Sequence, residues 1–142
     1  MQLLHIADLH FGRLLYGRSL MDDQRHFVRQ SLLPALDEYK PDALLIAGDL
    51  YDRQIASVDA IHLFDELIDA LCERSIPAVI ISGNHDSAQR LDVFRSELSD
   101  RGIHMIGNPP MQKGETIERV TLTDDFGAVN FYLLPFVRPG MV

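Results

Sequence analysis

The sequence predicts an α/β fold in which a parallel β-sheet is layered with helices. Two observations predict it. Short, uniformly apolar runs recur through roughly the first hundred residues, and segments with helical hydrophobic spacing lie between them. This alternation of strand and helix is typical of right-handed βαβ units. Beyond that point the sequence predicts antiparallel strands joined by turns.

Three apolar runs predict strands that are buried on both faces of the sheet. They cover Leu3–Ala7, Ala43–Ala47 and Ala78–Ser82, and each is followed by a turn signal. Each run is too short and too uniformly apolar for an amphipathic helix. Strands of a parallel sheet are usually buried on both faces, so this pattern fits a parallel arrangement.

Three helices are predicted around these strands. Asp22–Tyr39 has apolar residues at helical spacing, and Pro34 within it predicts a kink. Ser57 can cap a second helix. The apolar stripe of this second helix comprises Ile61, Phe64, Leu67, Ile68 and Leu71. A third helix is expected from about Ala88 to Asp100, with Gly102 as its stop. Its apolar face comprises Leu91, Phe94 and Leu98.

The remaining third of the chain predicts short strands. Ile103–Ile106 is expected to form a further strand after the third helix, and Thr116–Leu122 and Ala128–Leu134 an antiparallel pair. Turns are expected at Gly114 and at Asp124–Gly127.

Composition and charge restrict the possible functions. Twenty-one acidic and 13 basic side chains give a net charge of −8, which is unfavourable for non-specific binding of phosphate backbones and suits a domain that gathers carboxylates around cations. The single Cys72 excludes an internal disulfide framework. The apolar start of the chain, Met1–Ala7, is too short for a signal peptide or a membrane span. We expect a soluble, cytoplasmic protein with no membrane association.

Polar clusters directly follow the three apolar runs. They are Asp8-Leu9-His10, the segment from Gly48 to Arg53, and the segment from Gly83 to Asp86. The carboxyl ends of neighbouring parallel strands are where open α/β sheets bind ligands, so these clusters are expected to meet.

The side chains in these clusters suit divalent cations. Asp8, His10, Asp49 and Asn84 offer carboxylate, imidazole and amide groups, a mixture that manganese, iron and zinc accept. Asp49, from the middle cluster, could bridge two ions roughly 3.5–4 Å apart, the spacing used for in-line attack on phosphorus. Alternatively, Asp, Asn and Gly simply end strands and cap helices. That interpretation is favoured for any single cluster and disfavoured for three in succession.

The motifs D-x-H, G-D-x-x-D and G-N-H-D, in this order, resemble the first three motifs of the calcineurin-like metallophosphoesterases. Within that superfamily the chain is most similar to the nuclease subunits of bacterial SbcCD complexes. The narrower resemblance rests on Leu-His-Ile-Ala-Asp-Leu-His, Leu-Ile-Ala-Gly-Asp-Leu-Tyr-Asp, Ile-Ser-Gly-Asn-His-Asp-Ser and Leu-Pro-Phe-Val-Arg-Pro. It covers essentially the whole chain and implies a layered β-sandwich flanked by helices, of which this chain would be the amino-terminal half.

The resemblance implies a role for each motif residue. Asp8 and His10 would hold a first metal ion, usually manganese. Asp49 would bridge to a second ion, which Asn84 would also hold. His85 would not be a ligand; it would face the phosphodiester and assist departure of the leaving oxygen.

Position 52 distinguishes branches of the superfamily. The nuclease relatives often have a His there, whereas Asp52 followed by Arg53 resembles the phosphatases, in which the Asp orients the catalytic His and the Arg contacts phosphate. A carboxylate on the far nitrogen of His85 would favour its protonated form and make it a better acid. A solvated turn residue and a surface arginine are the alternative interpretations of the two positions.

Members of the superfamily complete the metal site with a Gly-His and a later Gly-His-x-His. Only His104 follows His85 in this chain, and it matches neither motif. We therefore expect residues 1–142 to be the amino-terminal part of a metallophosphoesterase domain, ending before the last metal-binding motifs. Such a chain alone is expected to bind metal weakly and to be inactive as a nuclease.

The resemblance implies a manganese-dependent DNA exonuclease and endonuclease subunit of DNA repair and recombination, acting with an SbcC-type ATPase. It also implies a homodimer formed through the second and third helices. Two alternatives stay open. One is a calcineurin-like phosphatase or small-molecule phosphodiesterase, which Asp52, Arg53 and the acidity favour. The other is a non-catalytic dimerising module.

Overall fold

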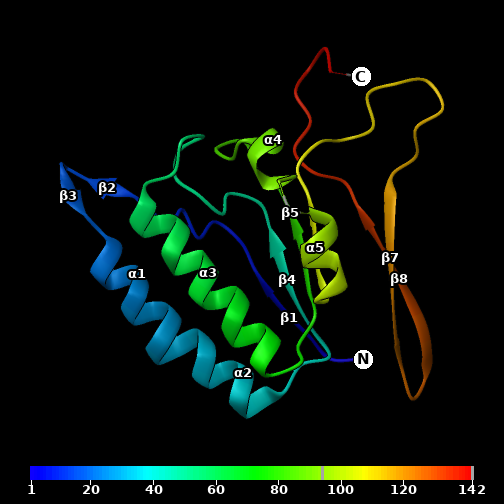
Figure 1. The fold of residues 1–142 in the computed structure, drawn as a ribbon, viewed down its shortest axis with the longest axis horizontal. Coiled ribbons are helices and arrows are strands. Elements are labelled where there is room, and N and C mark those ends of the chain that lie inside the picture. The colour runs from blue at the N-terminus through cyan, green and yellow to red at the C-terminus, as the bar shows by residue number, and fades with distance from the viewer. Residues whose placement is uncertain (94, 142) are drawn as a thin grey trace.

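The chain folds around a parallel four-stranded sheet (Figure 1). The structure is a computed structural model and describes residues 1–93 and 95–141. The strands lie in the order β1 (Leu3–Ile6), β4 (Ala43–Ala47), β5 (Ala78–Ile81) and β6 (Ile103–Ile106). All three neighbouring pairs are parallel. The α/β fold predicted from the sequence is therefore confirmed.

Strand β1 is less buried than predicted. It forms one edge of the sheet, and Leu3 and His5 on its outer face are exposed. Leu4 and Ile6 alternate with them and pack against the core. The prediction that this strand is buried on both faces was wrong because only one face is covered at this edge.

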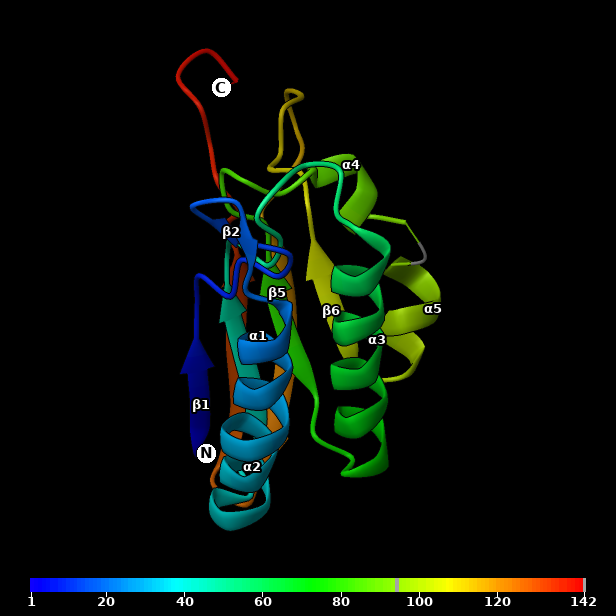
Figure 2. The ribbon, with the colours of Figure 1, turned by 90° about the vertical axis from the view of Figure 1, so that its left-hand side faces the viewer.

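Helices cover that one face (Figure 2). The first rod consists of α1 (Met21–Phe27), the π-helical turn η1 (Val28–Leu32) and α2 (Leu33–Tyr39), which together confirm the predicted helix. Pro34 lies in the first turn of α2, directly after the wider π turn. Proline has no N–H to donate to the preceding turn, so an ordinary α-turn cannot be completed at Pro34. The switch from π-helical to α-helical geometry lies at this point of the chain.

The second helix, α3 (Val58–Glu73), begins as predicted after Ser57, whose hydroxyl accepts the N–H of Ala60 at 3.3 Å. Four of the five predicted stripe residues are buried. The exception is Ile61, which is 49% exposed, while Leu63 is buried in its place. The buried face is therefore rotated slightly from the predicted stripe.

The predicted third helix is divided into α4 (Ala88–Leu91) and α5 (Arg95–Asp100). Between them, the Asp92 carboxylate accepts the main-chain N–H of Gly107 and the side-chain N–H of Asn108, both at 2.7 Å. These bonds tie the chain at Asp92 to the segment after β6. Leu91 is buried as predicted, and Phe94 lies outside the described residues.

A hairpin of β7 (Glu118–Asp124) and β8 (Gly127–Leu133) packs on the opposite face of the sheet. The two strands and the turn between them match the prediction to within two residues at each end. A small second core joins the hairpin to the sheet: Val79, Ile106, Val120 and Leu133. A further two-residue pair, β2 (Leu14–Leu15) and β3 (Arg18–Ser19), follows the loop after β1.

Across residues 1–93 and 95–141, no helix is both long enough and apolar enough to cross a bilayer.

Candidate metal centre

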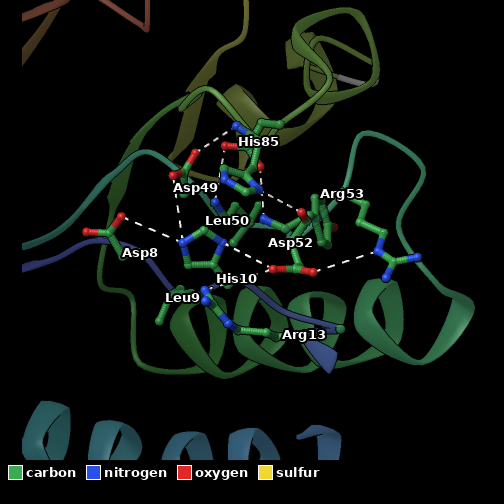
Figure 3. Close-up of polar contacts among 12 residues, drawn as sticks. Asp8, Leu9, His10, Arg13, Asp49, Leu50, Asp52, Arg53 and His85 are labelled. Carbon is green, nitrogen blue, oxygen red and sulfur yellow. Dashed lines mark hydrogen bonds and ion pairs between the residues drawn. The ribbon is translucent and has the colours of Figure 1, made fainter. Parts of the chain in front are cut away.

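The loops after β1, β4 and β5 converge at the carboxyl edge of the sheet. The main-chain N–H of Asp8 donates to the carbonyl of Gly48 (3.2 Å), and that of His10 donates to the carbonyl of Asp49 (2.9 Å). The main-chain N–H of His85 donates to the Asp49 carboxylate at 2.9 Å. Residues far apart in the sequence are thus fixed together by direct hydrogen bonds (Figure 3).

Three of the four predicted metal ligands adopt left-handed backbone. The φ angles are 57° at Asp8, 46° at His10 and 49° at Asp49. Each such residue costs on the order of 1–3 kcal/mol and is retained only where its surroundings hold it. Strain of this kind concentrates at functional sites, and here it coincides with the residues that the sequence singled out.

Gly83 allows the loop after β5 to approach Asp49. A Cβ at Gly83 would lie 2.1 Å from Oδ1 and 2.3 Å from the main-chain nitrogen of Asp49. No side chain larger than hydrogen fits without displacing one of the predicted ligands. The glycine of G-N-H-D is therefore a packing requirement of the candidate centre.

Asp8, His10 and Asp49 form the first group of potential ligands. Their ligand atoms all lie within 4.8 Å of one another. Nε2 of His10 is 3.8 Å from Oδ1 of Asp8 and 3.7 Å from Oδ2 of Asp49. These separations are too long for hydrogen bonds, and they leave the three donors directed toward a common point (Figure 3).

The donor set fits a divalent metal ion. Two carboxylates and an imidazole suit manganese, iron or zinc, and neither carboxylate of the group is neutralised by an Arg or Lys within ion-pair distance among the described residues. Asp8 is largely exposed, whereas His10 and Asp49 are mostly buried. An ion here would have two anchored ligands and one solvent-facing ligand.

Asp52 lies differently from its expected position. Its carboxylate is 3.6 Å from Nδ1 of His10 and reaches toward Arg13 and Arg53 at 4.0 and 3.8 Å. His85 instead has its Nδ1 2.8 Å from the main-chain carbonyl of Asp52. The expected carboxylate–His85 contact was wrong: the side chain of Asp52 is turned toward the first motif.

The Nδ1 atoms of His10 and His85 have different surroundings. A carbonyl only accepts, so His85 carries its proton on Nδ1 in this contact. His10 Nδ1 is buried without a hydrogen-bond partner among the described residues, and the Asp52 carboxylate is beside it. The rings of His10 and His85 meet edge to face, with centroids 4.8 Å apart. His10, Asp52 and His85 form a second group whose ligand atoms lie within 4.8 Å of one another.

The other two predicted residues lie at the rim. Asn84 is exposed and sits between Gly83 and His85 in the loop after β5. Arg53 is also exposed, and it flanks the Asp52 carboxylate (Figure 3).

Asp86 is a residue that the sequence analysis did not single out. It is 6% exposed, and its carboxylate accepts three main-chain N–H groups, from Leu50 (3.1 Å), Tyr51 (2.9 Å) and Gly83 (2.8 Å). It therefore ties the loop after β4 to the loop after β5. Its position at the end of the G-N-H-D motif was the feature of the sequence that could have identified it.

Tyr51, in the loop after β4, is half-buried against helix α3. Burial raises the pKa of its phenol, and the nearby Asp86 carboxylate raises it further. Its ring packs edge to face against Phe64 of α3. The raised pKa keeps the phenol protonated at neutral pH.

The fold and the convergent carboxylate–imidazole cluster define a metal-site phosphoesterase architecture, and comparison with known proteins agrees. Residues 1–134 match the family described as calcineurin-like phosphoesterase. The chain belongs to this family.

Two curated relatives are named as a subunit of the nuclease SbcCD. The protein from Staphylococcus saprophyticus is 37% identical over 142 residues, an alignment that covers 96% of this chain and 34% of the relative. The protein from Staphylococcus epidermidis is 34% identical over 143 residues, covering 100% of this chain and 36% of the relative. The chain thus spans about a third of the length of these relatives.

Proposed function

We propose that this chain supplies the first three motifs of a two-metal nuclease that hydrolyses DNA phosphodiester bonds. The observation that carries the proposal is the convergence of Asp8, His10 and Asp49, whose ligand atoms lie within 4.8 Å of one another at the carboxyl edge of the sheet. The names of the two staphylococcal relatives support the choice of a nuclease.

Asp8, His10 and Asp49 would hold the first divalent cation, and Asp49 and Asn84 the second. When bound, such ions activate water and stabilise the negative charge that develops on phosphorus oxygens. Manganese is the proposed ion because it accepts both carboxylate and imidazole donors.

Asp52 is proposed to orient His10. Metal-binding imidazoles commonly donate their second N–H to a carboxylate, which directs the other nitrogen to the ion. Asp52 is the carboxylate beside Nδ1 of His10, at 3.6 Å. A small movement of either side chain would complete the hydrogen bond and give the buried Nδ1 a partner.

His85 is proposed as the acid that protonates the leaving oxygen. The Asp52 carbonyl fixes Nδ1, so Nε2 is the atom that can face substrate. A protonated His85 keeps the Nδ1 bond and donates its other proton to the departing oxygen.

Arg53 and Arg13 lie beside the centre. Both guanidinium groups are exposed and both lie about 4 Å from the Asp52 carboxylate. Such loose pairing costs little to break. Arg53 is the proposed phosphate-binding residue, partly offsetting the net charge of −8.

The complete assembly is proposed to include an SbcC-type ATPase and a second copy of this chain. An apolar groove of about 590 Å³ lies between α3 and the α4–α5 region, bordered by the exposed side chains of Ile61 and Val93. This surface combines the second and third predicted helices, and a partner copy would bury it.

A phosphatase or small-molecule phosphodiesterase is the second candidate. The consecutive Asp52 and Arg53 favour it, because an arginine at the rim can bind a phosphate monoester.

A chimera tests the proposal. Residues 1–134 would replace the corresponding segment of the Staphylococcus saprophyticus protein, and an identical chimera with Asp49→Ala would serve as control. We expect Mn²⁺-dependent hydrolysis of linear DNA in the first chimera and its loss in the second. A folded chimera that hydrolyses p-nitrophenyl phosphate but not DNA would contradict the nuclease assignment.

A further inference from the structure

We infer that Gln24, on α1, is a positioning residue that holds the His10 loop in its metal-binding conformation. The inference rests on the metal centre proposed above and concerns a side chain outside the three motifs. Gln24 touches none of the proposed ligand atoms, so its effect would pass through the main chain of the loop.

The Gln24 amide makes three hydrogen bonds to this loop. Its Nε2 donates to the carbonyls of Leu9 (3.1 Å) and His10 (2.7 Å). Its Oε1 accepts the main-chain N–H of Gly12 at 3.0 Å. One half-buried side chain therefore satisfies main-chain groups on both sides of the ligand.

The loop needs this support because its backbone is strained. His10 has a φ angle of 46°, and Asp8, two residues earlier, has one of 57°. On the strand side, the loop is held by main-chain bonds from His10 to Asp49 and from Phe11 to the next residue of the β4 loop. Those bonds use N–H groups. Gln24 instead holds the carbonyls of Leu9 and His10, together with the N–H of Gly12.

The helix that carries Gln24 is itself fixed. The main-chain N–H of Gln24 donates to the carbonyl of Leu20 at 2.9 Å, and Met21, at the start of α1, is buried. Arg25 pairs with Asp59 of α3 at 3.3 Å. The amide of Gln24 is therefore presented from a rigid element, as precise positioning requires.

Only a primary amide of this length satisfies the three contacts. Glutamate keeps the acceptor but has no N–H for the two carbonyls, and its charge would face their oxygens. Methionine has similar length and volume without either function. Either substitution removes the Gln24 N–H bonds to the carbonyls of Leu9 and His10. The His10 carbonyl keeps its hydrogen bond from the main-chain N–H of Arg13 (3.1 Å), and the loop can relax from its left-handed turn.

The test uses the 142-residue chain with Gln24→Met and Gln24→Glu. The matched controls are Gln30→Met and Gln30→Glu, the same changes at an exposed glutamine on the same helical rod. Three properties are measured: amide hydrogen exchange at Gly12 in metal-free protein, the Mn²⁺ concentration that half-broadens the NMR signals of the loop, and the metal-free unfolding temperature.

Gln24→Met is expected to accelerate exchange at Gly12 and to raise the half-saturating Mn²⁺ concentration about tenfold, the lower end for outer-shell residues of metal sites. Gln24→Glu is expected to weaken binding as well, although its added charge would attract a cation. Neither Gln30 variant is expected to change exchange or Mn²⁺ binding.

Mn²⁺ binding within twofold of the unmodified chain in both Gln24 variants would overturn the inference. So would unchanged exchange at Gly12 in Gln24→Met, which removes the acceptor of the Gly12 N–H. If the unmodified chain does not bind Mn²⁺, the metal-centre proposal fails, while exchange at Gly12 and the His10 ring signals still show whether Gln24 holds the loop. Equal losses of Mn²⁺ binding and of unfolding temperature in the Gln24 and Gln30 variants would identify a general loss of stability and contradict positioning.

Discussion

The main-chain N–H of His85 donates to Oδ1 of Asp49 at 2.9 Å. The proposed acid and the proposed bridging ligand are therefore joined directly, and Oδ2 of Asp49 is left facing His10 at 3.7 Å. Because this bond uses the backbone of His85, its imidazole stays free to contact the Asp52 carbonyl. The loops after β4 and β5 are thus a single unit.

Gly83→Ala is expected to damage this unit. The added methyl would lie 2.1 Å from the Asp49 carboxylate, and Gly83 does not need a positive φ, so the effect is purely steric. Overpacking of this kind costs about 1–3 kcal/mol. Urea unfolding should show that loss, and Mn²⁺ titration should show weakened binding. Unchanged stability and binding would mean that Asp49 is not held where the structure places it.

Asp86→Asn is expected to destabilise the chain by about 1–3 kcal/mol, because an amide offers one oxygen where the carboxylate serves three N–H donors through two. Urea unfolding measures the change. The control is Asp125→Asn, which removes the same charge at an exposed position. Equal stability of the two variants would show that the Asp86 contacts contribute nothing.

The sequence predicted the sheet and the meeting of the motifs because both follow from strong patterns. Uniformly apolar runs such as Ala43–Ala47 identify buried strands, and the carboxyl ends of parallel strands necessarily share one edge. The exposure of Leu3 was not predictable in this way, since it depends on how far the β7–β8 hairpin extends over the sheet.

The directions of individual side chains were the other feature that the sequence could not predict. Local spacing could not show that the Asp52 carboxylate faces His10 while its carbonyl meets His85. Nor could it show the break at Asp92, because the bonds that divide the third helix go to residues 15 and 16 positions later. Both features are decided by tertiary contacts.

The variant His85→Gln tests whether His85 acts as a general acid or as a metal ligand. In the chimera, we expect DNA hydrolysis to fall by about 10²–10⁴-fold, the usual contribution of general acid catalysis. Mn²⁺ affinity should stay within about twofold, because the main-chain bond from this position to Asp49 is retained. A parallel loss of Mn²⁺ binding would instead make His85 a ligand.

His104 is expected to make stability fall in mild acid. Burial lowers its pKa, against a smaller opposing effect of Glu118, so the unfolded chain takes up this proton before the folded chain does. Stability is therefore complete above the ordinary histidine pKa of about 6.5 and declines as pH falls through the lower folded value.

Urea unfolding of His104→Gln at pH 7.5 and 5.5 checks this. The decline between the two pH values should be smaller than in the unmodified chain, whereas exposed His26→Gln should leave it unchanged. An identical decline in all three proteins would show that His104 does not contribute.

The most direct test of the metal centre is calorimetric titration of the 142-residue chain with Mn²⁺, alongside Asp49→Ala and the exposed-site control Asp125→Ala. Asp49 belongs to the cluster that carries the proposal, and Asp125 removes a charge elsewhere. We predict weak, saturable binding that Asp49→Ala abolishes and Asp125→Ala preserves. Binding that survives in Asp49→Ala, or no binding by the unmodified chain, would contradict the proposed metal centre.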